Sequence, residues 1–470
     1  MRILSHCTAL LVGSLATWTW SPRVLGHQFN GTLDSNDFGV VIPEEARVQP
    51  ASGFINEVAD DSARAFTEKT TPTPVPTTPM PTMAPTKKPM KRSNNTYSTS
   101  QHQQHIQHAI RAGSVQSQGV NLGGWLVSEH WMNQQSDIWK GMSSEDANSG
   151  EQMAFRTTKQ EEAVGRFKWH RDNFITESEV AAIANAGFNT IRVPVGYWIV
   201  GFDNHDISGQ NQWKNYAPGG LEYLDRLIQD WARKYNVAVL ISMHAAKGSQ
   251  NGADHSSPEE KGKSFWSHYP ENIASTLESV VFLADRYKNE EAFLGIGLLN
   301  EPGGSTSNDV LYKYYEDAYK AIRQDAGNDC ILTIAPLLWE QSASHMVDLL
   351  PGANNVWVEW HRYFVWGYEN AGEEELLGKA MTQFRDDVNA WKKKSDKKMF
   401  IGEFSFATAG KFQDQARLKE FGAKQMDVMF NTVNGGWTFW SWRIYGDENG
   451  VNPWSLRSLL WNGIFPGLKK

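Results

Sequence analysis

Cysteine is almost absent from this sequence, which has two among its 470 residues, Cys7 and Cys330. Cys7 lies in an N-terminal segment that we expect to be removed, so the mature chain keeps one thiol and forms no internal disulfide. Cys330 begins an apolar run, and we expect a small buried side chain there rather than a nucleophile. Without disulfides the fold must depend on a hydrophobic core, which a chain of this length can build.

Basic residues are outnumbered: 45 Lys and Arg stand against 53 Asp and Glu, for a formal net charge of −8. Nucleic-acid binding needs a clustered basic face, so we exclude nucleic acid as the partner. No group of His, Cys and carboxylate residues has the spacing of metal ligands, so we expect no metal and no other cofactor. Trp is abundant instead, with 20 copies. Most belong in a core, but flat aromatic faces also stack on sugar rings.

Long apolar runs are missing as well, so we expect no membrane span. Residues 1–26 have the pattern of a secretory signal peptide, with Arg2 at the start, an apolar centre at 9–16 and Gly26 for cleavage. The chain ends in two lysines and not in a hydrophobic tail, so we expect no GPI anchor. We therefore predict a secreted, extracellular protein.

Residues 27–114 are predicted to be a disordered linker ahead of the folded domain. The tract 71–89 is rich in Pro and Thr, so it stays extended and is suited to O-linked sugars. N-glycosylation sequons begin at Asn30 and Asn94, both upstream of the folded part. The basic pair at 91–92 is either a processing site that makes this segment a propeptide or a solvated pair in the linker.

From about residue 115 onward, short apolar runs alternate with amphipathic helical stretches eight times. The strand candidates are 119–127, 188–195, 237–244, 293–300, 330–336, 356–363, 399–405 and 435–442. This alternation predicts parallel strands joined by crossovers. Eight units fit one closed barrel better than a doubly wound sheet, so we assign 115–470 to an α/β domain, a (β/α)8 TIM barrel.

Helix signals lie between these runs. Thr176 and Glu179 form a capping-box pattern that opens a helix running towards Ala186. Residues 221–228 have apolar side chains at helical spacing. The segment 133–173 is a long insertion before the second strand, and we expect it to be polar and at the surface.

Two glutamates interrupt strongly apolar runs at predicted strand ends. Glu301 follows Asn300 after the fourth run, and Glu403 ends the seventh. TIM-barrel active sites lie at the carboxyl ends of the strands. Retaining glycoside hydrolysis needs two carboxyl groups about 5 Å apart, one to protonate the leaving oxygen and one to attack the anomeric carbon. A lone Glu at a strand end is usually a solvated loop residue, but this pair predicts catalysis.

Other strand ends also carry polar or aromatic residues. Arg192 lies inside an otherwise apolar strand and needs a carboxylate, for which Glu403 is the natural partner. The third, sixth and eighth runs end near His244, His361 and Trp440. Each histidine alone is more often a satisfied core residue, but so many polar strand ends indicate one site.

Together these motifs resemble family 5 glycoside hydrolases, and within them the secreted exo-β-1,3-glucanases. The resemblance is carried by Asn-Leu-Gly-Gly-Trp at 121–125, Ile-Arg-Val-Pro at 191–194, Asn-Glu-Pro at 300–302 and Ile-Gly-Glu at 401–403. Segments 248–252 and 462–466 match that subgroup rather than cellulases. The resemblance covers residues 115–466.

The resemblance implies a role for each matching residue. It implies that Glu301 is the acid/base and Glu403 the nucleophile. Arg192 and Tyr363 would position Glu403. Asn300 holds the sugar 2-hydroxyl, a hydrogen bond that strengthens as charge develops at the anomeric centre.

The resemblance also implies the residues that hold the non-reducing sugar. They are His244 and His361 lining its subsite, Glu129 and Asp254 binding its hydroxyls, Trp440 as the floor, and Trp366 as an aromatic clamp at the cleft entrance. We expect Trp442, two residues after Trp440, to point away from this subsite.

The sequence departs from the family pattern in loops that close one end of the cleft. His130-Trp131 replaces the usual Pro-Tyr, Ala253 replaces the other entrance aromatic, His255 replaces Asn and Lys247 replaces Pro. The catalytic pair is untouched, but linkage preference and strict exo action stay open.

We therefore predict a monomeric, secreted or cell-wall associated, retaining exo-β-1,3-glucanase that acts on a β-glucan polysaccharide or oligosaccharide. One alternative is a β-glucanase or transglucosylase of another linkage preference, such as β-1,6. The other is a non-catalytic glucan-binding protein, against which the paired carboxylates argue, because a binder needs none. The sequence leaves open whether the glucan belongs to the organism's own wall or to a host.

Overall fold

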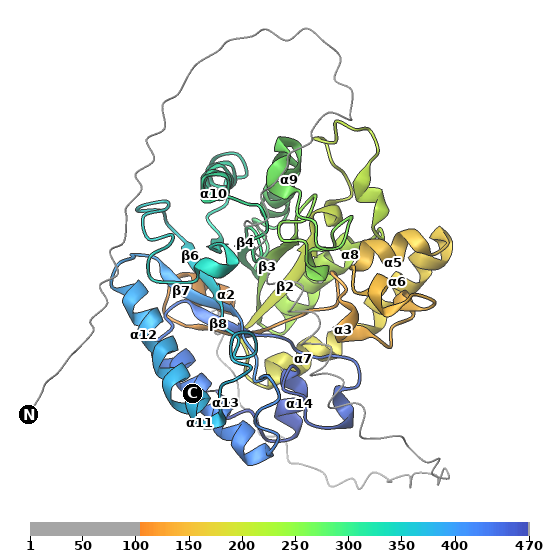
Figure 1. The fold of residues 1–470 in the computed structure, drawn as a ribbon. Helices are drawn as coiled ribbons and strands as arrows, with labels where there is room; N and C mark the ends of the chain where they lie inside the picture. The colour runs from red at the N-terminus through yellow and green to blue at the C-terminus, as the bar shows by residue number, and fades with distance from the viewer. Residues whose placement is uncertain (1–103, 469–470) are drawn as a thin grey trace, which may run out of the picture. The chain divides into compact units, whose positions relative to one another are not determined.

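The computed structural model describes residues 104–468, in which eight parallel strands close into a barrel in the order β1 to β8 (Figure 1). The strands are β1 (Ser117–Asn121), β2 (Thr190–Gly196), β3 (Ala238–Ala245), β4 (Phe293–Gly297), β5 (Ile331–Ile334), β6 (Val356–His361), β7 (Lys398–Glu403) and β8 (Gly436–Phe439). β1 pairs with both β2 and β8, which closes the sheet. The predicted (β/α)8 TIM barrel is confirmed.

Helices surround the barrel, most of them in the connections between strands. The α-helices of the described residues are α2 (Ile106–Arg111), α3 (His130–Asn133), α4 (Ser144–Ala147), α5 (Glu151–Thr157), α6 (Gln160–Phe174), α7 (Glu177–Asn185), α8 (Gly220–Asp225), α9 (Pro270–Arg286), α10 (Asn308–Gln324), α11 (Glu373–Glu375), α12 (Met381–Lys392), α13 (Gln415–Asn431) and α14 (Leu456–Trp461). In Figure 1, α9 and α10 lie on one side of the barrel and α12 and α13 on the other. The helix predicted at 221–228 is present as α8 and the π-helical turn that follows it (Arg226–Ala232).

The first strand ends at Asn121, earlier than the predicted run of 119–127. Residues beyond it, such as Leu122 and Val127, are as buried as strand residues, which is why the apolar pattern continued. Gly124 has a φ of +71°, a left-handed conformation that a strand does not adopt. The chain therefore turns there and leads to Glu129 at the carboxyl end of the barrel.

The helix predicted after Thr176 forms as α7, but its capping box does not. Thr176 makes no side-chain capping hydrogen bond. Glu179, the other member of the predicted box, accepts a hydrogen bond from Trp442 Nε1 at 2.6 Å and pairs with Arg457 at 2.8 Å. These tertiary partners hold the carboxylate away from the backbone N–H that the box requires.

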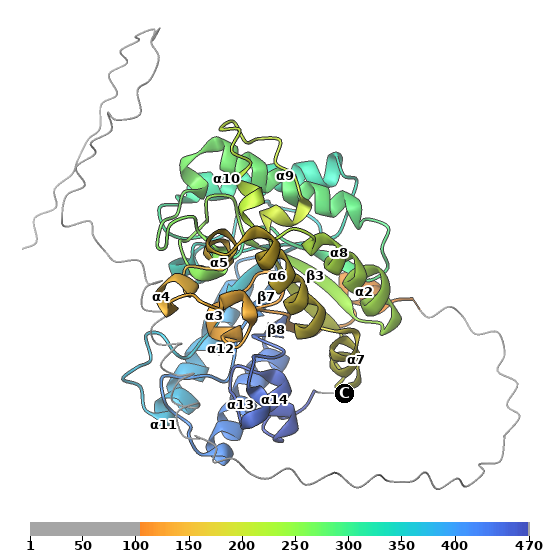
Figure 2. The ribbon, with the colours of Figure 1, turned by 90° about the vertical axis from the view of Figure 1, so that its right-hand side faces the viewer.

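The insertion at 133–173 is not simply a polar surface segment, and that expectation was wrong. It folds into α4, α5 and α6, which Figure 2 shows grouped together with α3. Its apolar residues pack into a cluster of their own: Ile138, Trp139, Ala147, Ala154, Phe155, Ala163 and Phe167, with Ala217. Polar residues between them hid this helical periodicity. Arg171 joins the insertion to the next loop by donating to the backbone oxygens of Ala217 and Pro218.

The amino end of the barrel is closed by α2, which lies upstream of residue 115, in the segment that the sequence analysis assigned to the linker. The backbone N–H of Ile106 donates to Asn236 Oδ1 at 2.7 Å, and Arg111 donates to the backbone oxygen of Phe293 at 3.1 Å. These partners stand at the starts of β3 and β4. Ile110, fully buried, packs against the first interior side chains of the strands.

Cys330 is fully buried, as predicted. The predicted signal peptide, Cys7, both sequons and the Pro/Thr tract lie outside the described residues. Among residues 104–468, no helix combines the length and apolar character needed to cross a membrane.

Candidate active site

A hollow opens at the carboxyl ends of the strands. It is lined by Glu129, Trp131, His244, Asp254, His255, Glu301, Tyr363, Trp366, Glu403, Trp440 and Trp454. Most of the predicted site residues are in this set. The other three, Arg192, Asn300 and His361, lie directly beside it and contact the residues that line it. The fold therefore brings together residues that are spread over more than 300 positions of the sequence.

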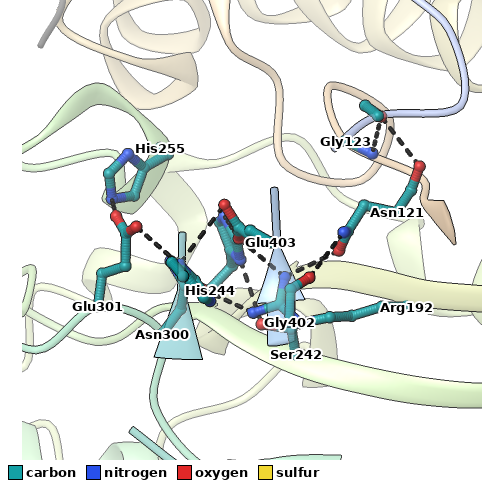
Figure 3. Close-up of polar contacts among 12 residues, drawn as sticks. Asn121, Gly123, Arg192, Ser242, His244, His255, Asn300, Glu301, Gly402 and Glu403 are labelled. Atoms are coloured by element: carbon teal, nitrogen blue, oxygen red, sulfur yellow. Dashed lines mark hydrogen bonds and ion pairs between the residues drawn. The ribbon is translucent and has the colours of Figure 1, made fainter. Parts of the chain in front are cut away.

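Glu301 and Glu403 lie close to each other in this hollow (Figure 3). One carboxylate oxygen from each, together with a ring nitrogen of His361, all lie within 4.8 Å of one another. Glu403 is the last residue of β7, and Glu301 follows the end of β4. Glu301 has a φ of +43°, which is strained for a residue with a side chain. Such strain at a residue that lines a hollow suggests a functional role.

Arg192 is the hub beneath the hollow and is 1% exposed. Its Nη1 donates to Glu403 Oε1 and to Asn121 Oδ1, both at 2.9 Å, and its Nη2 donates to Asn300 Oδ1 at 2.7 Å (Figure 3). Nη2 also lies 2.8 Å from Glu359 Oε1. The predicted partnership of Arg192 with Glu403 is confirmed. One guanidinium thus fixes groups from several strands in a single arrangement.

Glu359, in the middle of β6, is a buried carboxylate that the sequence analysis missed. It accepts a hydrogen bond from Thr333 Oγ1 and pairs with Arg192. A Cβ at position 402 would lie 1.8 Å from Glu359 Oε1, so Gly402 is needed to make room for this carboxylate. Burial raises the pKa of Glu359, but Arg192 and His361 outweigh burial and hold it at about 2. The sequence does hold a signal for Glu359. Residues two apart on a strand share a face, and Glu359 is two residues before the predicted site residue His361.

His361 stands among three carboxylates. Its Nδ1 lies 2.7 Å from Glu301 Oε1 and 3.6 Å from Glu403 Oε2, and its Nε2 lies 3.2 Å from Glu359 Oε1. Burial lowers the pKa of His361, but Glu403, Glu301 and Glu359 outweigh it and raise the pKa to about 10. The resemblance implied that His361 lines the sugar subsite. In the structure it contacts the carboxylates from beside the hollow.

Glu301 and His361 together hold one proton. Burial raises the pKa of Glu301, but the hydrogen bond and charge of His361, with smaller contributions from His255 and Arg192, hold that pKa at about 2. These opposite pKa shifts favour a protonated imidazole beside a charged carboxylate, with His361 Nδ1 2.7 Å from Glu301 Oε1.

Glu403 is 5% exposed, and both of its carboxylate oxygens accept hydrogen bonds. Arg192 donates to Oε1, and the Tyr363 hydroxyl donates to Oε2 at 2.9 Å. Burial raises the pKa of Glu403; His361 and Arg192 oppose this, and Glu301 adds to it. The two donors fix the direction in which the carboxylate points.

Asn300 has a free hydrogen-bond donor beside the carboxylate pair. It is 3% exposed and its Oδ1 is occupied by Arg192, but its Nδ2 has no partner among the described residues. A buried amide N–H without a partner is unfavourable. Asn300 is therefore a candidate donor to a ligand.

Three titratable residues meet in the lining of the hollow: Glu129, Asp254 and His255, with ligand atoms within 4.8 Å of one another. Burial, followed by Asp254, raises the pKa of Glu129, and burial also raises the pKa of Asp254. Glu129 Oε2 accepts from Trp131 Nε1 at 2.9 Å, while its Oε1 has no partner among the described residues. His255 Nε2 lies 3.3 Å from Glu301 Oε2. Sequence spacing could not reveal this trio, because a turn after β1 and a loop after β3 bring it together.

Aromatic rings form the rest of the lining. Trp440 stacks on His244 with ring centroids 5.4 Å apart and an angle of 4° between the rings. Trp131 and Trp366 both pack against Trp454, which the sequence analysis did not select. Trp442 points away from the hollow, as predicted. Ala253 is buried and is not among the residues that line the hollow.

Comparisons with known proteins agree with this geometry. The family model described as "Cellulase (glycosyl hydrolase family 5)" matches residues 143–446. "Probable glucan 1,3-beta-glucosidase A" of Emericella nidulans is 29% identical over 391 residues, which are 74% of this chain and 89% of that protein. "Glucan 1,3-beta-glucosidase" of Pichia angusta is 27% identical over 74% of this chain and 85% of its own length.

Solved structures share the fold at low identity. A rutinosidase from Aspergillus niger aligns with a TM-score of 0.57 at 16% identity, over 76% of this chain and 99% of its own. AoRut aligns with a TM-score of 0.58 at 18% identity, over 74% and 96%. At such identities the likeness establishes the barrel fold.

Proposed function

The chain belongs to glycosyl hydrolase family 5, and on that premise we propose that it is a secreted, retaining exo-β-1,3-glucanase that releases glucose from a β-glucan. The observation that carries this proposal is the pair Glu301 and Glu403, whose carboxylate oxygens approach within 4.8 Å in one hollow. Retaining enzymes place their two carboxyl groups about 5 Å apart, whereas inverting enzymes leave room for a water between them.

In the first step, Glu403 attacks the anomeric carbon while the glycosidic oxygen takes a proton from Glu301. The bond from carbon to the leaving oxygen breaks, and a covalent glucosyl–Glu403 ester forms. In the second step, Glu301 removes a proton from water, the water oxygen attacks the anomeric carbon, and Glu403 leaves as the carboxylate. Arg192 and Tyr363 suit this role because they hold Glu403 in one orientation.

The proton for the first step is supplied by the ion pair of Glu301 with His361. A short transfer from His361 Nδ1 to Glu301 Oε1, which are 2.7 Å apart, places it on the carboxyl group. A sugar in the hollow displaces water from around the carboxylate, and desolvation favours the protonated carboxyl. His361 remains held by Glu359 on its other nitrogen.

Asn300 Nδ2 is suited to bind the sugar 2-hydroxyl, because it is buried, unpartnered and beside both carboxylates. A hydrogen bond there strengthens as positive charge develops at the anomeric centre. Glu129 and Asp254 also line the hollow and would accept hydrogen bonds from the sugar hydroxyls, and Trp440 would stack under the ring.

Exo action is supported by the residues that line the hollow beside the carboxylate pair. Trp131 donates to Glu129 and packs against Trp454, and all three line the hollow. The resemblance assigns Glu129 to the hydroxyls of the non-reducing sugar, which is the end of a chain. A second candidate is a β-glucanase or transglucosylase of another linkage preference, because this chain has Ala253 where the resemblance implies an entrance aromatic.

Product analysis on laminarin and on a β-1,6-glucan tests the proposal. We expect the wild type to release only glucose from laminarin, and Glu403→Gln to release none while still folding. Oligosaccharide products would instead indicate an open cleft, and faster hydrolysis of the β-1,6-glucan would indicate the second candidate. Binding without any turnover would overturn the enzymatic proposal for these glucans.

Glu301→Gln separates the acid/base from the nucleophile. We expect about 10²–10⁴-fold slower laminarin hydrolysis, because the leaving oxygen then receives no proton. An aryl glucoside with a good leaving group needs little protonation, so its bond cleavage should slow far less. Equal losses on both substrates would contradict the acid/base role.

A further inference from the structure

A second hollow, of about 300 Å³, lies between the loops that follow β2 and β3 and shares no lining residue with the catalytic hollow. The loop after β3 separates the two. Asp254 and His255 from this loop line the catalytic hollow, whereas Lys247, Gly248 and Ser249 line the second. The second hollow is therefore a neighbour of the proposed active site without being part of it.

Buried polar groups without partners face this second hollow. Tyr197 is 2% exposed and Gln152 is 3% exposed. Both line the hollow, and neither the Tyr197 hydroxyl nor the Gln152 side-chain amide has a hydrogen-bond partner among the described residues. Burial raises the pKa of Tyr197, so its hydroxyl stays a proton donor. Because both residues line the hollow, their polar groups are available to bond a polar occupant.

The charges around the second hollow exclude an anion as that occupant. Lys247 is the only cation in its lining, and its ammonium is already paired with Asp203 at 2.7 Å and lies 4.0 Å from Asp206. The carboxylates of Glu259 and Glu271 also line the hollow. An anion would meet this excess of negative charge, whereas neutral hydroxyl groups can donate to carboxylates.

Aromatic rings narrow the choice to a neutral ligand with a flat apolar face. Phe265 and Tyr269 belong to the lining, and Tyr269 is 49% exposed. Rings, uncharged donors and carboxylates together match the two faces of a pyranose, which are apolar, and its rim of hydroxyls.

We propose that the second hollow binds a sugar residue of a neutral glucan, outside the catalytic centre. Because its walls belong to the loops after β2 and β3, a polymer held there stays next to the proposed active site. The identity of the sugar chain as a β-glucan rests on the proposed function. The existence of the site rests only on the contacts above.

Calorimetric titration with laminarihexaose tests this proposal in Glu403→Gln, which prevents turnover. We expect two binding events. Glu129→Gln, added to this variant, should weaken only the event at the catalytic hollow. Tyr197→Phe should weaken only the other event, by about tenfold for one lost hydrogen bond. Because the Tyr197 hydroxyl bonds to nothing in the protein, the melting temperature should not fall.

Tyr319→Phe is the matched control: its ring packs against Arg323 on α10, away from both hollows, and should leave both events unchanged. A single binding event, or two events that Tyr197→Phe does not alter, would overturn the proposal. Wild-type hydrolysis of laminarin is measured separately. No hydrolysis with two binding events rejects the proposed function alone, and normal hydrolysis with one binding event rejects the second site alone.

Discussion

The interior of the barrel has two halves with opposite chemistry. At the strand starts, the inward side chains are apolar and pack on Ile110 of α2: Ala238, Leu240, Leu294, Ile331, Trp357 and Phe400. At the strand ends, the same faces carry Arg192, Ser242, His244, Glu359 and His361. In β3 the change occurs within one row of alternate residues, from Ala238 and Leu240 to Ser242 and His244.

The comparison shows how a barrel can hold buried charges. The apolar half supplies hydrophobic burial and needs no polar partners. The charged half gains little net stability, because desolvation offsets the attraction between its ions. Several contacts instead fix the positions of its side chains, because Arg192 contacts four residues at once: Asn121, Asn300, Glu359 and Glu403. The charged half therefore supplies orientation, and the apolar half supplies the scaffold that holds it.

Replacing the hub should produce the largest effect. Arg192→Met leaves Glu359 and Glu403 buried with only His361 as a nearby cation, so we expect a loss of about 3–5 kcal/mol in the free energy of unfolding at pH 7. Activity should fall by at least about 10²-fold because Glu403 loses its orientation.

The pKa of Glu359 is depressed to about 2 in the wild type, so its pairing stabilises the fold above the ordinary carboxyl pKa and not below pH 2. The stability loss should therefore shrink as the pH falls.

Arg286→Met is the matched control, because Arg286 pairs with Asp225 near the surface, with 35% of its side chain exposed. Such pairs contribute about 0–1 kcal/mol. Denaturant titrations of both variants at pH 4 and pH 7 measure the difference. Equal losses in the two variants would show that the hub is no more than an ordinary ion pair.

The insertion at 133–173 also contains a buried carboxylate, but no cation among residues 104–468 holds that carboxylate as Arg192 holds Glu359. Glu151, in α5, is 1% exposed, and burial raises its pKa to about 7, although Arg171 and the Ser128 N–H oppose burial. A raised carboxyl pKa stabilises the fold fully below the ordinary value of 4.5, and this contribution disappears as the pH rises through 7. The shift of the Glu151 pKa from 4.5 to about 7 corresponds to about 3 kcal/mol of unfolding free energy.

Glu151→Gln should remove this dependence. We expect the variant to match the wild type near pH 4 and to be more stable at pH 8, by up to about 3 kcal/mol. Glu145→Gln, at an exposed position of the same insertion, should leave the curve unchanged. Unfolding free energies measured from pH 4 to pH 8 decide the matter, and parallel curves for Glu151→Gln and the wild type would show that Glu151 stays charged throughout.

The barrel was predictable because its signals are local. Each apolar run lies within a few residues of an observed strand, and the run at 119–127 extended too far only because the buried residues after Asn121 look like strand residues. The cluster inside the insertion and the docking of α2 depend on contacts between distant segments. The sequence around Ile110 and around Phe155 does not indicate which distant residues each side chain packs against.

The site was predictable where polar residues interrupt strand ends, as at Arg192, Glu301 and Glu403. Glu359 was not predicted because it lies inside an apolar run and not at the end of one. Trp454 belongs to no strand and reaches the hollow through the packing of the last loop. The position of His361 among three carboxylates depends on a register shift between β6 and β7 beside it, which a sequence pattern does not show.

The substitution with the smallest expected effect tests most directly whether the apolar and charged halves of the barrel interior act independently. Ile110→Val removes one methylene from the apolar half, which should cost about 1 kcal/mol of unfolding free energy. Ile110 packs on apolar side chains, so the loss should be the same at pH 4 and pH 8, and kcat should not change. Denaturant titration and laminarin kinetics on the same preparation measure both quantities. A fall in kcat alongside the small stability loss would mean that packing at the strand starts also sets the geometry of the carboxylates, and the two halves would have to be treated as one unit.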